Sequence, residues 1–415
     1  MTVTDPARRL TVTDAWRPRR TFILRVLALY AACRIVTTVI LLLVMQRQAP
    51  TGMTGGDDIP VTYFPFTALW DGQWYQTIAT EGYPDHVPRG EDGGAQQNAW
   101  AFYPLFPFAA RAFMAVTGLE FPAAGSMIAL LCGFGAAVLM GLLLRERIGE
   151  AAALVVVVLW ASFPASVTLQ LAYTESVAML LLVAYLLALA RERWLVAAGI
   201  AVLVGLTRPI AVPLGVVTLV ALWLRWRARD DRPIERREYA AGLASLVACG
   251  VAGFLWPAIA WGATGERSAY TDTMGAWRGS GVVEPFGPWL GMSKYVFGET
   301  WGPVWLVVVP LVILAMVVGP WARGLGMQLR TWSVAYPAYL AAVLDPFTSI
   351  FRYLIPMFPL LAVMVGAGWE DRRGTTWPRL LVRAVPLLVL FIVGQYYWTD
   401  ILWRYVPSPT GDYPP

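Results

Sequence analysis

The sequence is poor in charge and in side chains that bind metals. Asp, Glu, Lys and Arg make up 14% of its 415 residues, whereas a soluble chain would hold about 25%. Lysine and histidine each occur once, as Lys294 and His86, and the three cysteines, Cys33, Cys132 and Cys249, lie far apart in apolar segments. This pattern fits neither a zinc site nor a disulfide framework. We therefore expect no protein-bound metal and no other cofactor.

Apolar residues, in contrast, are abundant and make up 58% of the chain. Runs of roughly 18 or more apolar residues recur, and each can cross about 30 Å of hydrocarbon. The net charge of +5 comes from arginines clustered between these runs, which is typical of orientation signals in membrane proteins and gives no sign of nucleic-acid binding. The arginine bias is also typical of GC-rich bacterial genes. The chain is predicted to be one all-α, polytopic membrane domain over residues 1–415, with about eleven or twelve spans.

The predicted spans follow from the positions of the apolar runs: 21–45, 123–144, 151–170, 176–190, 194–206, 209–224, 238–262, 303–322, 327–344, 351–368 and 380–400. With residues 1–20 as a cytoplasmic tail, every arginine cluster between spans falls on the cytoplasmic side. Two conditions are needed: 99–118 stays interfacial or re-entrant, and 194–224 forms a hairpin around Thr207, Arg208 and Pro209. A full crossing at 99–118 would reverse the sides of everything that follows.

In this topology the other polar stretches all reach the outer face of a cell membrane. Two are long outer loops, 46–122 with interfacial or re-entrant helices and 263–302, and the others are short: 173–176, 207–209 and 345–353. Polar groups that converge on one membrane face indicate a site there, so we expect an extracytoplasmic active site.

The segment WDGQWYQTIATEGYP, residues 70–84, is the most unusual of these polar stretches. In a helix over 70–82, one face is shared by Trp70, Asp71, Trp74, Tyr75, Ile78 and Gly82, which predicts a short amphipathic helix lying in the membrane interface. Asp71 then has two interpretations. It caps the helix by accepting backbone N–H bonds, or its carboxylate faces a cavity and accepts a proton during chemistry.

Several motifs resemble those of the GPI mannosyltransferase II (PIG-V-like) proteins, which are glycosyltransferases of the GT-C architecture. The matching text is WDGQWYQTIATEGY, QNAWAFYPLFP, YTES at 173–176, LTRP at 206–209 and RY at 352–353. The resemblance implies inverting transfer of a sugar, expected to be mannose, from a polyprenyl-phosphate donor, with a first-loop carboxylate as general base. Asp71 matches the family's block, and Asp57 and Asp58 in the same loop are the alternative.

Two arginines are candidates for binding the donor phosphate. Arg208 and Arg352 lie in apolar surroundings at predicted outer span ends, where a charged group is costly and often functional. The planar fork of arginine can grip phosphate oxygens. The alternatives are that these arginines reach toward lipid headgroups, or that Glu175 ties Arg208 structurally. Arg34 and Arg111 are weaker candidates for the same role.

Aromatic side chains near these motifs are expected to contact substrate, because their faces stack on sugar rings. The expected substrate-binding residues are Trp70, Trp74, Tyr75, Tyr103, Tyr173, Glu175 and Tyr353. The expected partners are membrane lipids, the lipid-linked sugar donor and a glycan, glycolipid or protein acceptor. The alternative function is a transporter or flippase of a lipid-linked or anionic solute, which would need polar residues near the midplane and access from both faces.

Overall fold

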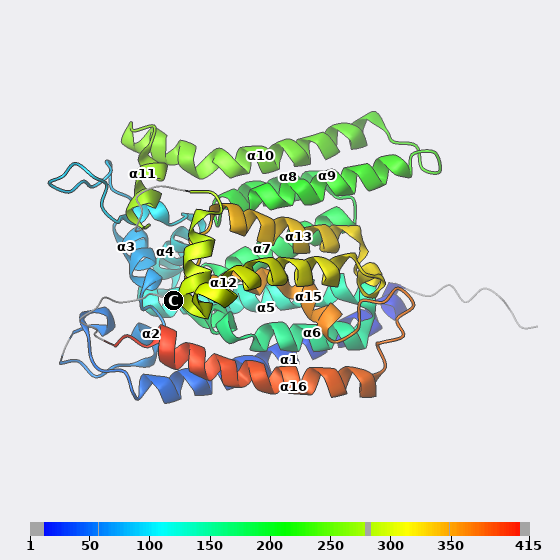
Figure 1. Ribbon diagram of the computed structural model, residues 1–415, viewed down its shortest axis with the longest axis horizontal. Helices are drawn as coiled ribbons and strands as arrows, with labels where there is room; N and C mark the ends of the chain where they lie inside the picture. Colours follow the sequence, from blue (N-terminus) through cyan, green and yellow to red (C-terminus); the bar gives the residue numbers. More distant parts are fainter. Residues whose placement is uncertain (1–11, 57, 279–283, 348, 407–415) are drawn as a thin grey trace, which may run out of the picture.

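The computed structural model describes residues 12–56, 58–278, 284–347 and 349–406, with side chains from residue 19 onward. Within these ranges the chain is helical and contains no β-strand. The predicted all-α fold is confirmed. Most of the helices run roughly side by side along the long axis of the molecule (Figure 1).

Five helices are long and apolar enough to cross a membrane. They are α1 (Val12–Met45), α5 (Phe121–Ile148), α10 (Arg236–Thr264), α12 (Gly287–Val318) and α16 (Trp377–Trp398). A sixth span results if α6 (Glu150–Ser162) and η3 (Pro164–Gln170) are taken together, although an 85° bend separates them. By length and composition, the described residues therefore provide five or six candidate spans rather than eleven.

Shorter helices occupy the other predicted spans. They are α7 (Glu175–Ala190), α8 (Trp194–Gly205), α9 (Ala211–Arg227), α13 (Gly326–Val343) and the series α14 (Ile350–Tyr353), η5 (Ile355–Met357) and α15 (Phe358–Met364). At 1.5 Å per residue most of them fall short of the roughly 20 residues that a span requires. Helices lie at the positions where hydropathy predicts spans, but only five or six of them are long and apolar enough to cross a membrane.

The predicted hairpin at 194–224 is present. Trp194 at the start of α8 and Leu222 near the end of α9 line one cavity together with the first turns of α10, so both helices return to the same end of the bundle. The segment 99–118 holds η2 (Ala99–Ala101) and α4 (Leu105–Thr117). Because α4 has 13 residues, it is too short to cross alone, as expected.

The break between α6 and η3 corrects the single span predicted at 151–170. Pro164 disfavours a helical conformation at the preceding residue, and Phe163 is extended with ψ 144°. The carbonyl groups freed by the break have donors: Arg34 donates to the carbonyls of Ala161 and Ser166, and Gln395 donates to those of Ala161 and Phe163. Arg34 is therefore held inside the core by the carbonyls at this break.

The two long polar loops also contain helices. The first holds η1 (Gly52–Thr54), α2 (Tyr63–Phe66), α3 (Asp71–Thr80), η2 and α4, as expected for interfacial helices. In the second, α11 (Ala269–Ala276) follows α10, and α12 begins at Gly287 instead of 303. Gly298 has φ 79° inside α12, a conformation that suits glycine, and the helix kinks there.

The bundle has two chemically different ends. One end, called the site end, carries α2, α3, α4 and α11 (Figure 1). The other end is called the basic end. There, ion pairs and hydrogen bonds connect helix ends and the segments between helices: Arg25–Glu150, Arg191–Glu146, Arg232–Glu192 and Arg147–Gln328. The remaining described elements, η4 (Pro320–Leu325) and η6 (Thr399–Trp403), lie beside α13 and α16.

Candidate functional site

Helix α3 places Asp71 at its first residue. The preceding residue, Trp70, has φ 58°, a strained conformation for a residue other than glycine. The Trp70 ring nitrogen holds this turn by donating to the carbonyl of Trp403 at 2.7 Å. Asp71 is inside the helix instead of at the N-cap position, and no side chain caps α3. Its carboxylate is free to face other elements.

The Asp71 carboxylate forms an ion pair with Arg352. Asp71 Oδ2 lies 2.8 Å from Arg352 Nη1, and the same nitrogen lies 3.1 Å from Glu175 Oε1. Glu175 Oε1 also accepts from Arg208 Nη2 at 2.5 Å. The four side chains thus form a chain of alternating charge, called the acid–arginine chain: Asp71, Arg352, Glu175, Arg208.

This chain of charges is buried. The side-chain exposure is 2% for Glu175, 6% for Arg352, 13% for Arg208 and 18% for Asp71. Two carboxylates and two guanidinium groups cancel in formal charge, which compensates part of the cost of removing them from water. The most exposed member is Asp71, which is therefore best placed to meet a solute arriving at the site end.

Tyr173 fixes the backbone at the start of α3. Its hydroxyl accepts a hydrogen bond from the Asp71 backbone N–H at 3.0 Å and donates to the Leu69 carbonyl at 3.1 Å. The Arg352 guanidinium lies over the Tyr173 ring, 5.1 Å from its centre. Burial, and then the carboxylate of Asp71, raise the pKa of Tyr173 well above its ordinary value. Tyr173 therefore remains a neutral donor at physiological pH.

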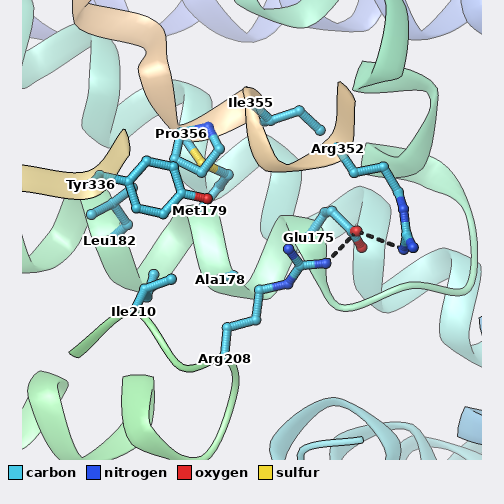
Figure 2. Close-up of a pocket in the computed structure, with 10 residues that line it drawn as sticks. All are labelled: Glu175, Ala178, Met179, Leu182, Arg208, Ile210, Tyr336, Arg352, Ile355 and Pro356. Carbon is cyan, nitrogen blue, oxygen red and sulfur yellow. Dashed lines mark hydrogen bonds and ion pairs between the residues drawn. The ribbon is translucent and has the colours of Figure 1, made fainter. Parts of the chain in front are cut away.

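Three polar atoms around the acid–arginine chain have no hydrogen-bond partner among the described residues. They are Glu175 Oε2, Arg352 Nε and the hydroxyl of Tyr336. Such atoms are rare in protein interiors and call for an explanation. Figure 2 shows Glu175 between Arg208 and Arg352, with Tyr336 on the other side of the same small cavity.

The cavity has a volume of about 10 Å³ and is lined by Glu175, Arg208, Tyr336 and Arg352 together with apolar side chains. That volume is close to the minimum for one water molecule. A phosphate group would not fit without movement of the side chains. In this conformation the arginines are paired with carboxylates, and a ligand would have to replace one of those pairs.

Several predicted aromatic residues lie against the same region. Tyr353 lies under the Arg208 guanidinium, 5.0 Å from ring centre to cation. Tyr75 packs edge to face against Tyr173 and Phe106. Burial, and then the carboxylates of Glu175 and Asp71, raise the pKa of Tyr75 well above its ordinary value, so Tyr75 contributes a neutral wall.

Other predicted residues already have partners elsewhere. Trp74 stacks on Phe102 and contacts Trp277 edge to face, and the Tyr103 hydroxyl bonds to that of Tyr270 at 3.1 Å. These two side chains join the segment between α1 and α5 to α11 and its C-terminal end.

The alternative carboxylate Asp58 and the weaker arginine candidate Arg111 are outside this arrangement. Asp58 is exposed and has no ion pair with any described residue, and Asp57 lies outside the described residues. Arg111 donates to the carbonyls of Ala79 and Ile78, so it satisfies the C-terminal end of α3. His86 is exposed and pairs with its neighbour Asp85. The described residues contain no group of three or more His, Cys, Asp or Glu side chains arranged to hold a metal.

Tyr336 is a site residue that sequence reasoning missed. It lies in α13, fully buried, and no short motif marks it. A signal was available in the segment YPAY, where a hydroxyl occurs in the middle of an apolar run and next to Pro337. A buried hydroxyl in such a place needs a partner or a function.

No protein-family model matches this chain, and no curated protein matches it. The resemblance to the PIG-V-like proteins therefore rests on the short motifs alone. Asp71, Tyr173, Glu175, Arg208 and Arg352 come from four of those motifs, and all of them lie in or against the acid–arginine chain.

Proposed function

We propose that this protein is a membrane glycosyltransferase of the GT-C type that transfers a sugar, most simply mannose, from a polyprenyl-phosphate donor to a hydroxyl of an acceptor. The observation that carries the proposal is the buried acid–arginine chain at one end of an all-α membrane bundle. It combines one partly exposed carboxylate, suited to proton transfer, with two guanidinium groups suited to a phosphate.

In the proposed reaction, the acceptor oxygen attacks the anomeric carbon of the donor sugar as the bond from that carbon to the phosphate oxygen breaks. Asp71 takes the proton of the attacking hydroxyl, and the electron pair of the broken bond leaves on the lipid phosphate. Arg208 and Arg352 stabilise the negative charge on that leaving group. Configuration at the anomeric carbon inverts in this single displacement.

The ion pairs imply an exchange of partners when the donor binds. Arg352 uses one nitrogen for both carboxylates, while its Nε has no partner. A phosphate that engages this guanidinium competes with Asp71 for it, and thereby frees the carboxylate to accept a proton. Glu175, which contacts both arginines, keeps them near each other before the donor arrives.

The site end is proposed to face outward. The arginine clusters at 145–147, 191–193 and 225–238 belong to the basic end, and such clusters favour the cytoplasmic side. In a background without Cys33, Cys132 and Cys249, a cysteine at the exposed position Thr80 should react with an impermeant thiol reagent on intact cells, whereas one at Asp230 should not. Labelling at Asp230 alone would reverse the assigned orientation.

The function is tested with purified protein and polyprenyl-phosphate-[³H]mannose, using glycan, glycolipid and peptide acceptors. The proposal expects transfer that is lost in Asp71→Asn and kept in Asp400→Asn. Asp400 is the matched control, because it also pairs with arginines, Arg47 and Arg404, and its side chain is 14% exposed. If the intact lipid-linked sugar instead moved from one leaflet to the other in proteoliposomes, with no sugar transferred to an acceptor, the protein would be a flippase.

A further inference from the structure

A second cavity lies at the basic end, between the end of α9 and the start of α10. Its volume is about 260 Å³. It is lined by Trp194, Leu222, Trp223, Arg225, Trp226, Ile234, Glu238, Tyr239 and Leu243. None of these residues belongs to the acid–arginine chain. The cavity is far larger than the one beside Glu175, and its wall is almost entirely apolar and aromatic.

The mouth of this cavity is formed by exposed aromatic residues. Trp223, Trp226 and Tyr239 are 45%, 52% and 62% exposed. Tryptophan and tyrosine favour the depth of the lipid headgroups, where one part of the ring is apolar and another is hydrated. Because α10 is a candidate membrane span that begins at Arg236, these residues lie at the level where the apolar span begins.

One polar atom in the wall lacks a partner. Trp194 is 4% exposed, and its ring N–H has no acceptor among the described residues. An unsatisfied buried donor costs free energy that a bound acceptor would recover. The two charged residues of the wall, in contrast, satisfy each other, since Arg225 binds both carboxylate oxygens of Glu238 at 2.6 and 2.9 Å.

The segment 223–239 around the mouth holds six arginines and four carboxylates, a net positive charge, and Arg229 pairs with Asp230 at 3.7 Å. Arg227 lies over the Trp223 ring, 5.1 Å from its centre, and Arg229 lies over Trp226 at 3.9 Å. Arg236 and Arg237, at the start of α10, are exposed and form no ion pair with the described residues. An apolar cavity with a buried donor and an arginine rim is complementary to a molecule with an apolar tail and an anionic head.

We propose that this cavity binds an anionic glycerophospholipid from the leaflet at the basic end. An acyl chain occupies the space between Leu222 and Leu243, an ester carbonyl accepts from Trp194, and the phosphate lies among Arg236, Arg237 and the arginines stacked on Trp223 and Trp226. Arginine is suited to this contact because its fork binds phosphate oxygens while its stem packs on apolar surface. Free inorganic phosphate would leave the apolar space empty.

The test uses the full-length protein in detergent, with phosphatidylglycerol or phosphatidylcholine added and bound lipid measured by native mass spectrometry. The proposal expects saturable binding of phosphatidylglycerol and at least roughly tenfold weaker binding of phosphatidylcholine. Leu243→Trp narrows the cavity from α10 and should weaken phosphatidylglycerol binding by about tenfold or more. Val247→Trp is its matched control, because Val247 is exposed on the same helix, one turn further along, and does not line the cavity.

Two further variants separate the headgroup from the cavity wall. Arg236→Gln with Arg237→Gln should reduce the preference for phosphatidylglycerol over phosphatidylcholine, whereas Arg372→Gln with Arg373→Gln, also among the arginines between predicted spans, should not. Trp194→Phe keeps the ring but removes the N–H and should weaken binding roughly two- to tenfold. Equal binding of the two lipids, or equal effects of Leu243→Trp and Val247→Trp, would overturn the proposal. So would full competition by inorganic phosphate, which would identify an anion site without a lipid.

Discussion

The two ends of the bundle use the same residue types in opposite ways. At the basic end, apart from the pairs of Arg225, whose side chain is 6% exposed, arginine and glutamate meet in more exposed pairs, such as Arg191–Glu146 with side chains 31% and 51% exposed. At the site end, Arg352 and Glu175 are 6% and 2% exposed. Water screens the first kind of pair, so one partner can change at little cost. The second kind is specific, because an unpaired charge left there would be buried.

The comparison separates the charges to which the proposed function assigns chemistry from those that join helices. Arginines at the basic end pair with carboxylates of neighbouring inter-helix segments, and in the proposed orientation their number matters more than their exact partners. At the site end, Arg208 and Arg352 come from separate segments, and both contact the carboxylate of Glu175. The following substitutions test this difference, starting with the largest expected effect.

Asp71→Asn should have the largest effect. It keeps the size of the side chain but cannot accept the acceptor's proton, so turnover should fall by roughly 10²–10⁴-fold, the usual contribution of general-base catalysis. Turnover and the melting temperature are measured in the same preparation. A variant with wild-type turnover and unchanged melting would remove Asp71 from catalysis and direct the search to Asp57 and Asp58.

Glu175→Gln should lower stability strongly, because it removes the negative charge shared by Arg208 and Arg352. Breaking a buried ion pair from one side costs about 3–5 kcal/mol in the free energy of unfolding. Glu146→Gln, at the basic end, breaks an exposed pair and should cost about 0–1 kcal/mol. Denaturant unfolding in one detergent compares the two variants. Equal losses would mean that burial does not distinguish the two ends.

Arg352→Lys should have an intermediate effect on the use of the lipid donor. Lysine keeps the positive charge but loses the planar fork, so donor binding should weaken by about 1–2 kcal/mol. The same change at Arg232, which pairs with Glu192 at the basic end, should leave donor use unchanged. The measurement is the KM for the polyprenyl-phosphate donor. An unchanged KM in Arg352→Lys would argue against a phosphate contact.

The smallest effect is expected from an exposed pair that lies at the site end. The Arg89 guanidinium hydrogen-bonds Glu266 and lowers the pKa of that carboxyl below its ordinary value of 4.5. A lowered pKa in the folded state stabilises the protein above the unfolded value, and this contribution is lost as the pH falls below about 4.5.

Because Arg89 Nη2 also pairs with Asp272 at 3.1 Å, Arg89→Gln should reduce the melting temperature slightly at pH 7 and not at all once Glu266 and Asp272 are both protonated. The wild-type and variant proteins are melted at several values between pH 3 and pH 7. A difference that grows toward low pH would show that Arg89 acts in some way other than through the carboxylates of Glu266 and Asp272.

The sequence was informative where local patterns decide structure. Hydropathy located the helices, and the spacing of Tyr75 and Ile78 predicted the buried face of α3, since both are buried. Pro164 was visible in the sequence, but the break in the helix that it causes could not be predicted from it alone. The break is stabilised by Arg34 and Gln395, which are distant in sequence and donate hydrogen bonds to the carbonyls that it frees.

The site was predictable in its members but not in its contacts. The motifs indicated Asp71, Glu175, Arg208 and Arg352, and a tie between Glu175 and Arg208 was one of the alternatives considered. That Arg352 pairs with Asp71 depends on how helices pack, which no local pattern encodes. For the same reason Trp74 could not be recognised as a packed residue: Phe102 and Trp277 occupy its faces.

The ion pair between Asp71 and Arg352 joins residues 281 positions apart in the chain. A ribosome adding about 5–20 residues per second makes Arg352 roughly 14–56 seconds after Asp71. During that interval Glu175 has only Arg208 as a cationic neighbour from the acid–arginine chain, and Asp71 has none. The partner that neutralises the candidate base is thus synthesised long after it, and the acid–arginine chain can be assembled only once residue 352 has been made.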